Sequence, residues 1–306
     1  MFDVYLKDIN VKVGEFCDLN KLSNDNLVFS SIRELEEFGY RGCYILKKDE
    51  EDYDKHVVDE FISDFDLDSI DYILYNNTFI EYKNYDSDQK NFMEFFLDYP
   101  LNRSLDKINK SIPHIGISQQ ACNGLFSCIE HAMNIFGSNE KYKNVLCISE
   151  DILPKGCFYD RPSQRMLFSD TVSGAVLTKD KTVYKLIDIK NIHIPNDNYF
   201  LFVDSVIKLI KNICKINSLD LKDIKNYFVP NFWEDTWMTI LEKIYDNNDI
   251  HYTNTIKIYA HGLSADFITN IKDYYAAGKF EKGGYYVGIS YGYGGNISCL
   301  LFKYDN

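Results

Sequence analysis

The sequence predicts an α/β protein composed of two halves of similar design. The chain has 306 residues, enough for one large domain or for two packed halves. Short apolar runs, typical of buried strands, alternate with longer segments of helical periodicity. The order strand, helix, strand, helix and closing strand pair occurs once before and once after residues 178–182. We therefore expect an N-terminal half at residues 1–178 and a C-terminal half at residues 179–306, although the halves share no visible sequence repeat.

In the first half, the opening forty residues show little pattern, and residues 22–38 are expected to be a loop followed by a short helix that Ser30 or Ser31 would cap. The charged run KKDEEDY at residues 48–54 is expected to be a solvated loop. Further helical segments are expected at residues 56–65, 92–97 and 123–136. Strands are expected at residues 72–75, 111–118, 143–149 and 174–178.

The second half repeats this alternation. Strands are expected at residues 183–193, 227–229, 256–260, 285–291 and 297–304. Helices are expected at residues 200–216, 231–245 and 266–275. A glycine-rich turn at residues 292–295 joins the last two strands.

Composition excludes several classes of function. The net charge of −13 argues against a nucleic-acid partner, because a phosphate-binding surface needs an excess of basic residues. The apolar runs are too short to span a bilayer, and the first residues, MFDVYLKDIN, do not form a signal peptide. We therefore expect a cytoplasmic protein without a membrane partner. The eight cysteines are scattered, with no CxxC and no zinc-ligand spacing, so most should be buried thiols and no metal is expected.

Cys122 is the strongest candidate for chemistry. In the stretch SQQACNGLFS it lies where a predicted strand ends and a helix begins. Unpaired N–H groups at a helix N-terminus stabilise a thiolate, and the N–H of Cys122 itself can face an oxyanion. Gly124 would leave room for a substrate to approach the backbone. The alternative is a buried structural thiol.

His261, Asn231 and Asp266 are the candidate partners of this cysteine. His261 lies in YAHGLSAD, after a predicted strand and before a helix, where sites of α/β proteins gather; otherwise it is a turn histidine. Asn231 follows a strand in YFVPNFW and can donate a hydrogen bond to a carbonyl oxygen, but a helix N-cap is its default role. Asp266 is five residues beyond His261 and could orient the imidazole, although an exposed carboxylate at a helix start is the more common case.

Five stretches in order resemble β-ketoacyl-ACP synthase III, a family of thiolase-fold condensing enzymes. SQQACNGLFSCIEHA resembles the nucleophile segment, LFSDTVSGAVL the strand pair that ends the first half, and SLDLKDIKNYFVPN the approach to the catalytic histidine. IYAHGLSAD resembles the segment of the catalytic asparagine, and SYGYGGNISCLLF the C-terminal glycine turn and last strand. The resemblance implies a thiolase-like fold of two pseudo-duplicated βαβαβ halves in α-β-α-β-α layers.

The resemblance assigns the nucleophile to Cys122 but exchanges the other two positions. Asn231 stands at the family's histidine position and His261 at its asparagine position. With this exchange, the sequence is more similar to the divergent branch of the family that serves secondary metabolism. That branch includes acyltransferases that use an oxygen or nitrogen acceptor. The resemblance further implies an oxyanion site formed by the backbone N–H of Cys122 and one from Tyr293 or Gly294. Asp170, in the altered Gly-Asp-Gly run, is expected to be structural.

We therefore expect ping-pong acyl transfer. Acyl-CoA or an acyl carrier protein with a phosphopantetheinyl arm would supply the acyl group, Cys122 would hold it, and a small molecule would accept it, with no permanently bound cofactor. Two alternatives remain open, a decarboxylative Claisen condensation with a malonyl thioester and a non-catalytic subunit paired with an active homologue. The resemblance implies a dimer, either a homodimer or a heterodimer. Lys155, Arg161 and Arg165 could supply a basic patch for an acidic carrier protein, or could belong to a solvated loop.

Overall fold

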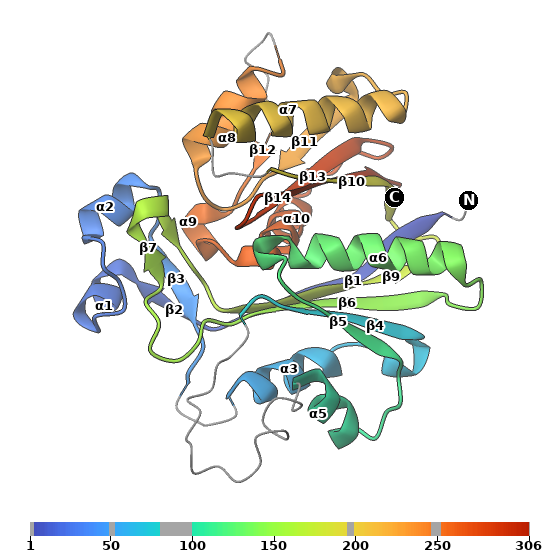
Figure 1. Cartoon of the computed structure of the whole chain (residues 1–306), viewed down its shortest axis with the longest axis horizontal. Coiled ribbons are helices and arrows are strands. Elements are labelled where there is room, and N and C mark those ends of the chain that lie inside the picture. The colour runs from blue at the N-terminus through green and yellow to red at the C-terminus, as the bar shows by residue number, and fades with distance from the viewer. Residues whose placement is uncertain (1–2, 49–52, 80–99, 195–198, 246–251, 306) are drawn as a thin grey trace.

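The computed structural model describes residues 3–48, 53–79, 100–194, 199–245 and 252–305. Figure 1 shows the arrangement of its elements. The helices are α1 Leu19–Asn24, α2 Ile32–Glu37, α3 Tyr53–Ser63, α5 Pro100–Lys107, α6 Gly124–Ser138, α7 Tyr199–Ile216, α8 Glu234–Glu242, α9 Ile256–Tyr259 and α10 Asp266–Ala276. Short 3-10 turns precede α6 at Ala121–Asn123 (η2) and α10 at Leu263–Ala265 (η5). The predicted turn at 92–97 lies outside the described residues.

Ten strands of the described chain form one sheet, in the order β12-β11-β13-β14-β10-β1-β9-β6-β4-β5. They are β1 Val4–Val13, β4 Tyr72–Asn77, β5 His114–Ile117, β6 Asn144–Asp151, β9 Thr171–Thr178, β10 Tyr184–His193, β11 Ile224–Phe228, β12 Tyr252–Thr253, β13 Tyr285–Gly292 and β14 Asn296–Tyr304. Two small hairpins lie outside it, β2 Glu15–Asp18 with β3 Gly42–Ile45 and β7 Asp160–Arg161 with β8 Met166–Leu167.

The sheet is internally duplicated. Outward from the centre, the strands of the first half follow the order β1-β9-β6-β4-β5, and those of the second half follow the order β10-β14-β13-β11-β12. In both halves the strand that comes first along the chain lies at the centre, followed by the fifth, the fourth, the second and the third strand. The directions match as well, because β4 and β11 each lie parallel to both neighbours while β9 and β14 are antiparallel to theirs. The antiparallel pair β1 and β10 joins the halves at the centre. The pseudo-duplicated architecture is therefore confirmed, whereas the boundary between residues 178 and 179 stays a prediction.

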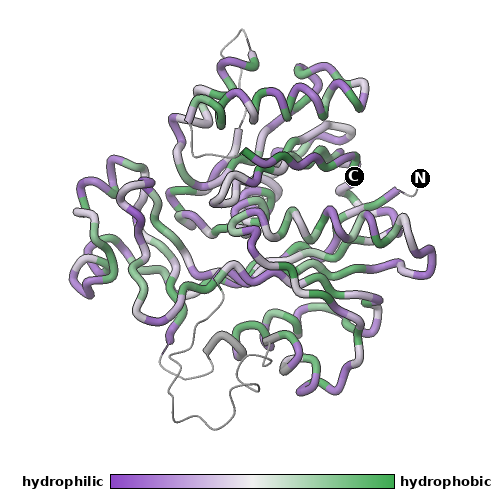
Figure 2. The backbone as a smooth tube through the Cα atoms, in the orientation of Figure 1, coloured by the Kyte–Doolittle hydropathy of each residue, from purple (hydrophilic) through white to green (hydrophobic). Residues whose placement is uncertain are grey.

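The helices separate the sheet into layers. Figure 1 shows α6 and α10 between the two halves of the sheet, α7 and α8 on the outer face of the second half, and α3 and α5 on the outer face of the first. α6 is apolar on several sides, and all six residues from Gly124 to Ile129 are buried, as a helix between two sheets requires. Phe126 of α6 packs edge-on against Phe267 of α10, with ring centroids 5.0 Å apart, so one apolar core joins the halves. α7 is amphipathic instead, and Figure 2 shows hydrophobic and hydrophilic residues alternating along it.

Most predicted elements are confirmed, and three expectations were wrong. Residues 256–259 form helix α9 and not a strand, because a short apolar run fits either structure and Thr255 leads it into a helical turn. The helix expected from residue 231 begins at Glu234. Lys48 is not part of a solvated loop, since its ammonium group contacts Asp170 and donates to the carbonyl oxygen of Leu153.

Two further expectations of the first half are met by the structure. Ser31 caps α2 with a capping box through Glu34. Asp170 is fully buried and accepts hydrogen bonds from the backbone of Leu46 and Leu153, which is a structural role. No helix among the described residues is long and apolar enough to cross a membrane.

Candidate active site

Cys122 lies in η2, between the end of β5 and the start of α6. The backbone before it is constrained, because Gln119 and Ala121 have positive φ angles of 63° and 46°, a region that non-glycine residues seldom occupy. The hydroxyl of Ser290 donates to the carbonyl oxygen of Cys122 at 2.8 Å and so ties η2 to β13. Cys122 is 9% exposed and lines a large cavity.

Cys122, His261 and Asp266 form a hydrogen-bonded row. The sulfur of Cys122 lies 3.3 Å from Nε2 of His261, and Nδ1 of His261 lies 2.6 Å from Oδ2 of Asp266. A carboxylate can only accept, so Nδ1 carries a proton and Nε2 faces the thiol. The structure thus brings together three of the predicted residues. The expectation of an exposed Asp266 was wrong, since this residue is 4% exposed.

Asp266 also organises the backbone around the histidine. Its Oδ1 accepts the N–H of Gly262 at 2.7 Å, and its Oδ2 accepts the N–H of Asn231 at 2.8 Å. Three donors therefore converge on one buried carboxylate, which fixes the imidazole plane relative to the sulfur.

The ionisation of His261 follows from these neighbours. Complete burial lowers the pKa of the imidazole. The charges of Asp266 and of the Cys122 thiolate together raise the pKa by more than burial lowers it, and the net result is a pKa of about 10. His261 is therefore an imidazolium at neutral pH.

The His261 loop is held in an unusual conformation. Ala260 has φ 52° and ψ −152°, a region that is nearly restricted to glycine. The backbone of His261 is anchored on both sides, donating to the carbonyl oxygen of Leu167 and accepting from the N–H of Ser169, each at 2.9 Å. The ring of Phe232 lies edge-on to the imidazole at 4.6 Å. These contacts fix a buried histidine directly after a short helix, and not after the strand that the sequence suggested.

The side chain of Asn231 is directed into a structural network. Its amide donates to the hydroxyl of Thr255 at 2.9 Å, and its oxygen accepts the N–H of Thr255 at 2.7 Å. Asn231 is fully buried and is not among the residues that line the cavity. It is not a helix N-cap either, because Trp233 occupies that position in α8.

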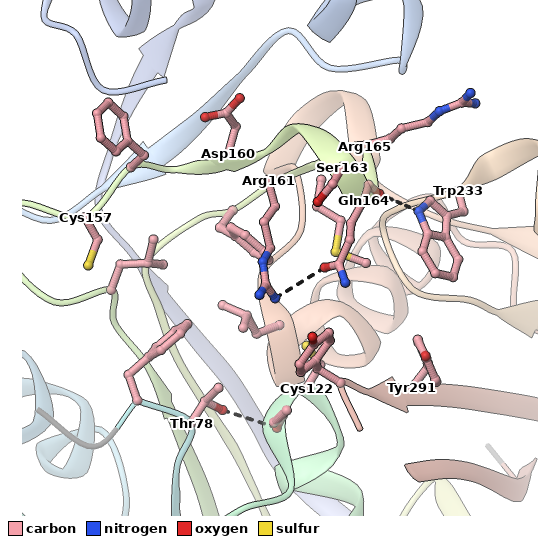
Figure 3. Close-up of a pocket in the computed structure, with 18 of the residues that line it drawn as sticks. Thr78, Cys122, Cys157, Asp160, Arg161, Ser163, Gln164, Arg165, Trp233 and Tyr291 are labelled. Atoms are coloured by element: carbon pink, nitrogen blue, oxygen red, sulfur yellow. Dashed lines mark hydrogen bonds between the residues drawn. The ribbon is translucent and has the colours of Figure 1, made fainter. Parts of the chain in front are cut away.

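A cavity of about 1230 Å³ opens above Cys122. Apolar and aromatic side chains make up most of its wall, among them Phe168, Phe202, Trp233 and Tyr291. Figure 3 shows Cys122 at the base of this cavity, below the guanidinium group of Arg161, which donates to the side chain of Gln164. Such a pocket, apolar with a few convergent polar groups, is typical of a small-molecule site.

Of the basic residues noted in the sequence, Arg161 and Arg165 line this cavity and Lys155 does not. Lys155 lines a neighbouring groove that shares Pro154, Gly156 and Cys157 with the cavity. Arg161 also lies over the ring of Tyr293 at 4.6 Å. Two of the three residues therefore line the cavity, and Lys155 lines the neighbouring groove.

The glycine turn after β13 lies beside the nucleophile segment. A Cβ on Gly292 would stand 2.3 Å from the carbonyl oxygen of Gln120, so only glycine allows this approach. Tyr293 and Gly295 line the cavity with Cys122, which is compatible with an oxyanion role for the amides of Tyr293 or Gly294. That role stays a prediction. Gly124 makes room for the side chain of Asn76 and not for a substrate, so that expectation was wrong.

Sequence reasoning missed a polar group beneath the nucleophile. Thr78 follows β4 and Asp151 ends β6, two neighbouring parallel strands, and both side chains lie close to η2. Their position at the carboxyl ends of parallel strands was the available signal. No cluster of three or more metal-binding side chains occurs among the described residues.

Comparison with solved structures identifies the fold. The ChlB3 acyltransferase matches with a TM-score of 0.79 and 13% identity, over 99% of this chain and 98% of that chain. The 3-oxoacyl-[acyl-carrier-protein] synthase III of Aquifex aeolicus matches with a TM-score of 0.78 and 16% identity, over 98% and 100%. The protein has the thiolase fold. OleA of Xanthomonas campestris shares it, with a TM-score of 0.74 and 9% identity over 99% and 98% of the two chains.

No protein-family profile and no curated protein matches the sequence. The thiolase fold expected from the five resembling stretches is nevertheless confirmed by these full-length structural matches. Two of these matched proteins are described by name as an acyltransferase and as a 3-oxoacyl synthase.

Proposed function

We propose that the protein is a ketosynthase III-like acyltransferase that acts through an acyl–Cys122 intermediate. The observation that carries this proposal is the row Cys122–His261–Asp266 at the base of a large apolar cavity. It has the features of an activated nucleophile, with a thiol in contact with an imidazole that a third group orients.

In the first step, the Cys122 thiolate attacks the carbonyl carbon of an acyl thioester carried by CoA or by a carrier protein. The amide of Cys122 and one from Tyr293 or Gly294 would stabilise the tetrahedral oxyanion. The carbon–sulfur bond to the carrier breaks, and the leaving thiolate takes the proton from Nε2 of His261. A C–S bond to Cys122 has replaced the one that was lost.

In the second step, neutral His261 accepts a proton from the hydroxyl or amine of the acceptor. The acceptor oxygen or nitrogen attacks the acyl carbon, and the Cys122 thiolate leaves. Asp266 stabilises the imidazolium that reforms, as the carboxylate does in serine hydrolase triads. The site thus returns to its starting protonation state.

This geometry favours acyl transfer over decarboxylative condensation. Condensation would need His261 and Asn231 to bind the malonyl thioester oxygen together, but the Asn231 amide is bonded to Thr255. A place in secondary metabolism, in the cytoplasm and in a homodimer or heterodimer completes the proposal, on the strength of the exchanged His and Asn positions and the fold.

The test is intact-protein mass spectrometry after incubation with a panel of acyl-CoAs and acyl carrier proteins. Wild type and Cys157→Ala, which removes the exposed cysteine, should gain the mass of the acyl group, and Cys122→Ala should not. Addition of alcohols and amines should then discharge the wild-type adduct but not that of His261→Ala. A folded wild-type protein that gains no mass from any donor would contradict the proposal and favour a partner subunit.

A further inference from the structure

A buried polar cluster lies directly beneath the peptide that leads into Cys122. We call it the Asp151 cluster, and it comprises Asn76, Thr78, Ser149, Asp151 and Ser264. Asp151 and Ser149 are fully buried, and Ser264 is 3% exposed. The cluster therefore joins β4, β6 and η5 below the nucleophile.

The cluster converges on one atom, the carbonyl oxygen of Ala121. The hydroxyls of Thr78 and Ser264 both approach this oxygen, at 3.2 Å and 3.3 Å, in addition to the N–H of Gly124. Figure 3 shows the Thr78 contact as a dashed line near Cys122. Because Ala121 has a positive φ angle of 46°, its peptide needs such external support to hold Cys122 in place.

Asp151 contacts the Thr78 hydroxyl directly, and it contacts Ser264 through the backbone and not through the hydroxyl. One carboxyl oxygen contacts the hydroxyl of Thr78, and the backbone N–H of Ser264 also donates to the carboxyl group. The other contact is the hydroxyl of Ser149, at 3.1 Å from Oδ2. Asp151 thus links the strand end that carries Thr78 to the turn that follows His261.

The protons in this cluster can be counted. The Thr78 hydroxyl has one proton but lies within reach of two acceptors, Oδ1 of Asp151 and the carbonyl oxygen of Ala121. If Asp151 is ionised, Thr78 must donate to it and cannot donate to Ala121. If Asp151 is protonated, its O–H donates to Thr78, and the Thr78 proton is free for Ala121.

The rest of the cluster agrees with the protonated form. The Asn76 amide donates to Ser149 at 2.8 Å and approaches Thr78 at 3.3 Å, so Ser149 in turn donates to Oδ2 of Asp151. With Asp151 neutral, each close contact in the cluster can be a hydrogen bond, because one proton is available for each pair of polar atoms. Burial is the largest influence and raises the pKa of Asp151 to about 7, against the lowering effects of Thr78, Ser149 and His261.

We propose that Asp151 is a positioning residue for acyl transfer. In its protonated form it donates to Thr78, which donates to the carbonyl oxygen of Ala121 and fixes the peptide before the nucleophile. Ionisation of Asp151 takes the Thr78 proton away from that peptide. The inference rests on the proposed function only for the identity of the step that is slowed.

The titratable groups that interact with Asp151 include His261, which follows α9, and Cys128 of α6. The other contacts come from uncharged Thr78, Ser149 and Ser264. The pKa of His261 is about 10 and burial raises that of Cys128 above its usual range, so neither titrates near pH 7.

The test measures the rate of Cys122 acylation against pH in a Cys157→Ala background. The parent rate should fall roughly three- to tenfold as pH rises through about 7, the effect of one lost hydrogen bond. Asp151→Asn keeps an N–H donor for Thr78 and cannot ionise, so it should keep the high rate with no fall. Thr78→Val should be slow at every pH, and Thr78→Ser should restore the parent profile.

A second readout separates this inference from the proposed function. Alkylation of Cys122 by iodoacetamide, measured on the peptide by mass spectrometry, needs no acyl donor and should show the same pH profiles. If no thioester acylates the protein, the proposed function fails while the alkylation profiles still test Asp151. A fall near pH 7 that persists in Asp151→Asn, or a Thr78→Val variant as fast as its parent, would overturn the inference.

Discussion

Asp266→Asn is the substitution that most directly tests the catalytic row. The carboxylate accepts from three N–H groups, those of His261, Gly262 and Asn231. An asparagine has one oxygen and one NH₂ group in the same place, so at least one donor must face another donor. If the amide nitrogen faces His261, the imidazole must turn its Nε2 proton toward Cys122 and cannot act as a base.

The expected magnitude follows from these contacts. A hydrogen bond to a charged group contributes about 1.5–3 kcal/mol, and a buried N–H left unpaired costs about 1–3 kcal/mol, so the free energy of unfolding should fall by roughly 3–6 kcal/mol. The orienting bond alone corresponds to about 10- to 100-fold in rate, at 1.4 kcal/mol per tenfold. The inverted tautomer adds to this, and the equivalent change in a Ser–His–Asp triad costs about 10⁴-fold. Discharge of the acyl enzyme should therefore slow by about 10²- to 10⁴-fold.

The effect on stability depends on pH in a defined direction. The folded-state pKa of His261 is about 10, above its ordinary value of 6.5. The stabilisation that the ion pair contributes is thus fully present below 6.5 and is lost as pH rises through about 10. The difference in unfolding free energy between wild type and Asp266→Asn should shrink over the same interval.

The assay combines urea unfolding at both ends of that interval with a stopped measurement of acyl-enzyme discharge. Asp273→Asn is the matched control, because it makes the same change at an exposed position of the same helix, α10. A folded Asp266→Asn protein that discharges its acyl group within about twofold of wild type would refute the triad assignment.

Three further substitutions separate structural from chemical roles. Asn231→Ala removes two buried hydrogen bonds to Thr255 and should lower the unfolding free energy by about 2–4 kcal/mol, while acyl loading by mass spectrometry stays within about threefold of wild type. Phe202→Ala should cost about 3–5 kcal/mol in urea unfolding and enlarge the cavity, so that loading shifts toward bulkier thioesters. Gly292→Ala should slow acylation at least about tenfold by displacing Gln120, whereas Gly137→Ala, in open space, should leave the rate unchanged. These assignments would be contradicted if Asn231→Ala lost acyl loading, or if Gly292→Ala were acylated as fast as wild type.

The sequence was most informative where one segment carries both a motif and a clear period. Cys122, just before the helix predicted at residues 123–136, is such a case. His261, which precedes Gly262, was also recognised as a candidate from its segment. The partnership of His261 with Asp266 was harder to predict, because five residues of separation do not reveal that η5 turns the chain back on itself. The exposure expected at a helix start was wrong since α10 begins between the two halves of the sheet.

Other misses have physical causes of their own. β1 was not recognised because a bulge between Lys7 and Asn10, with Asp8 at a φ of 48°, breaks the alternation of apolar residues. The duplicated strand order left no repeat in the sequence, since each half has packed its own side chains around the same topology. The Asp151 cluster depends on contacts among β4, β6 and η5, which no local pattern encodes.

The pairing of the two central strands, β1 and β10, also determines the distance between the candidate catalytic residues. Cys122 belongs to the first half of the chain and His261 to the second, and their 3.3 Å contact is set by how the halves are aligned. That alignment depends on β1 and β10, where Val4 pairs with Leu186 and Leu6 with Tyr184. A slip of one residue there would move one half by about 3.3 Å, comparable to the whole distance from sulfur to nitrogen. Residues far from the sulfur thus decide whether it meets its base.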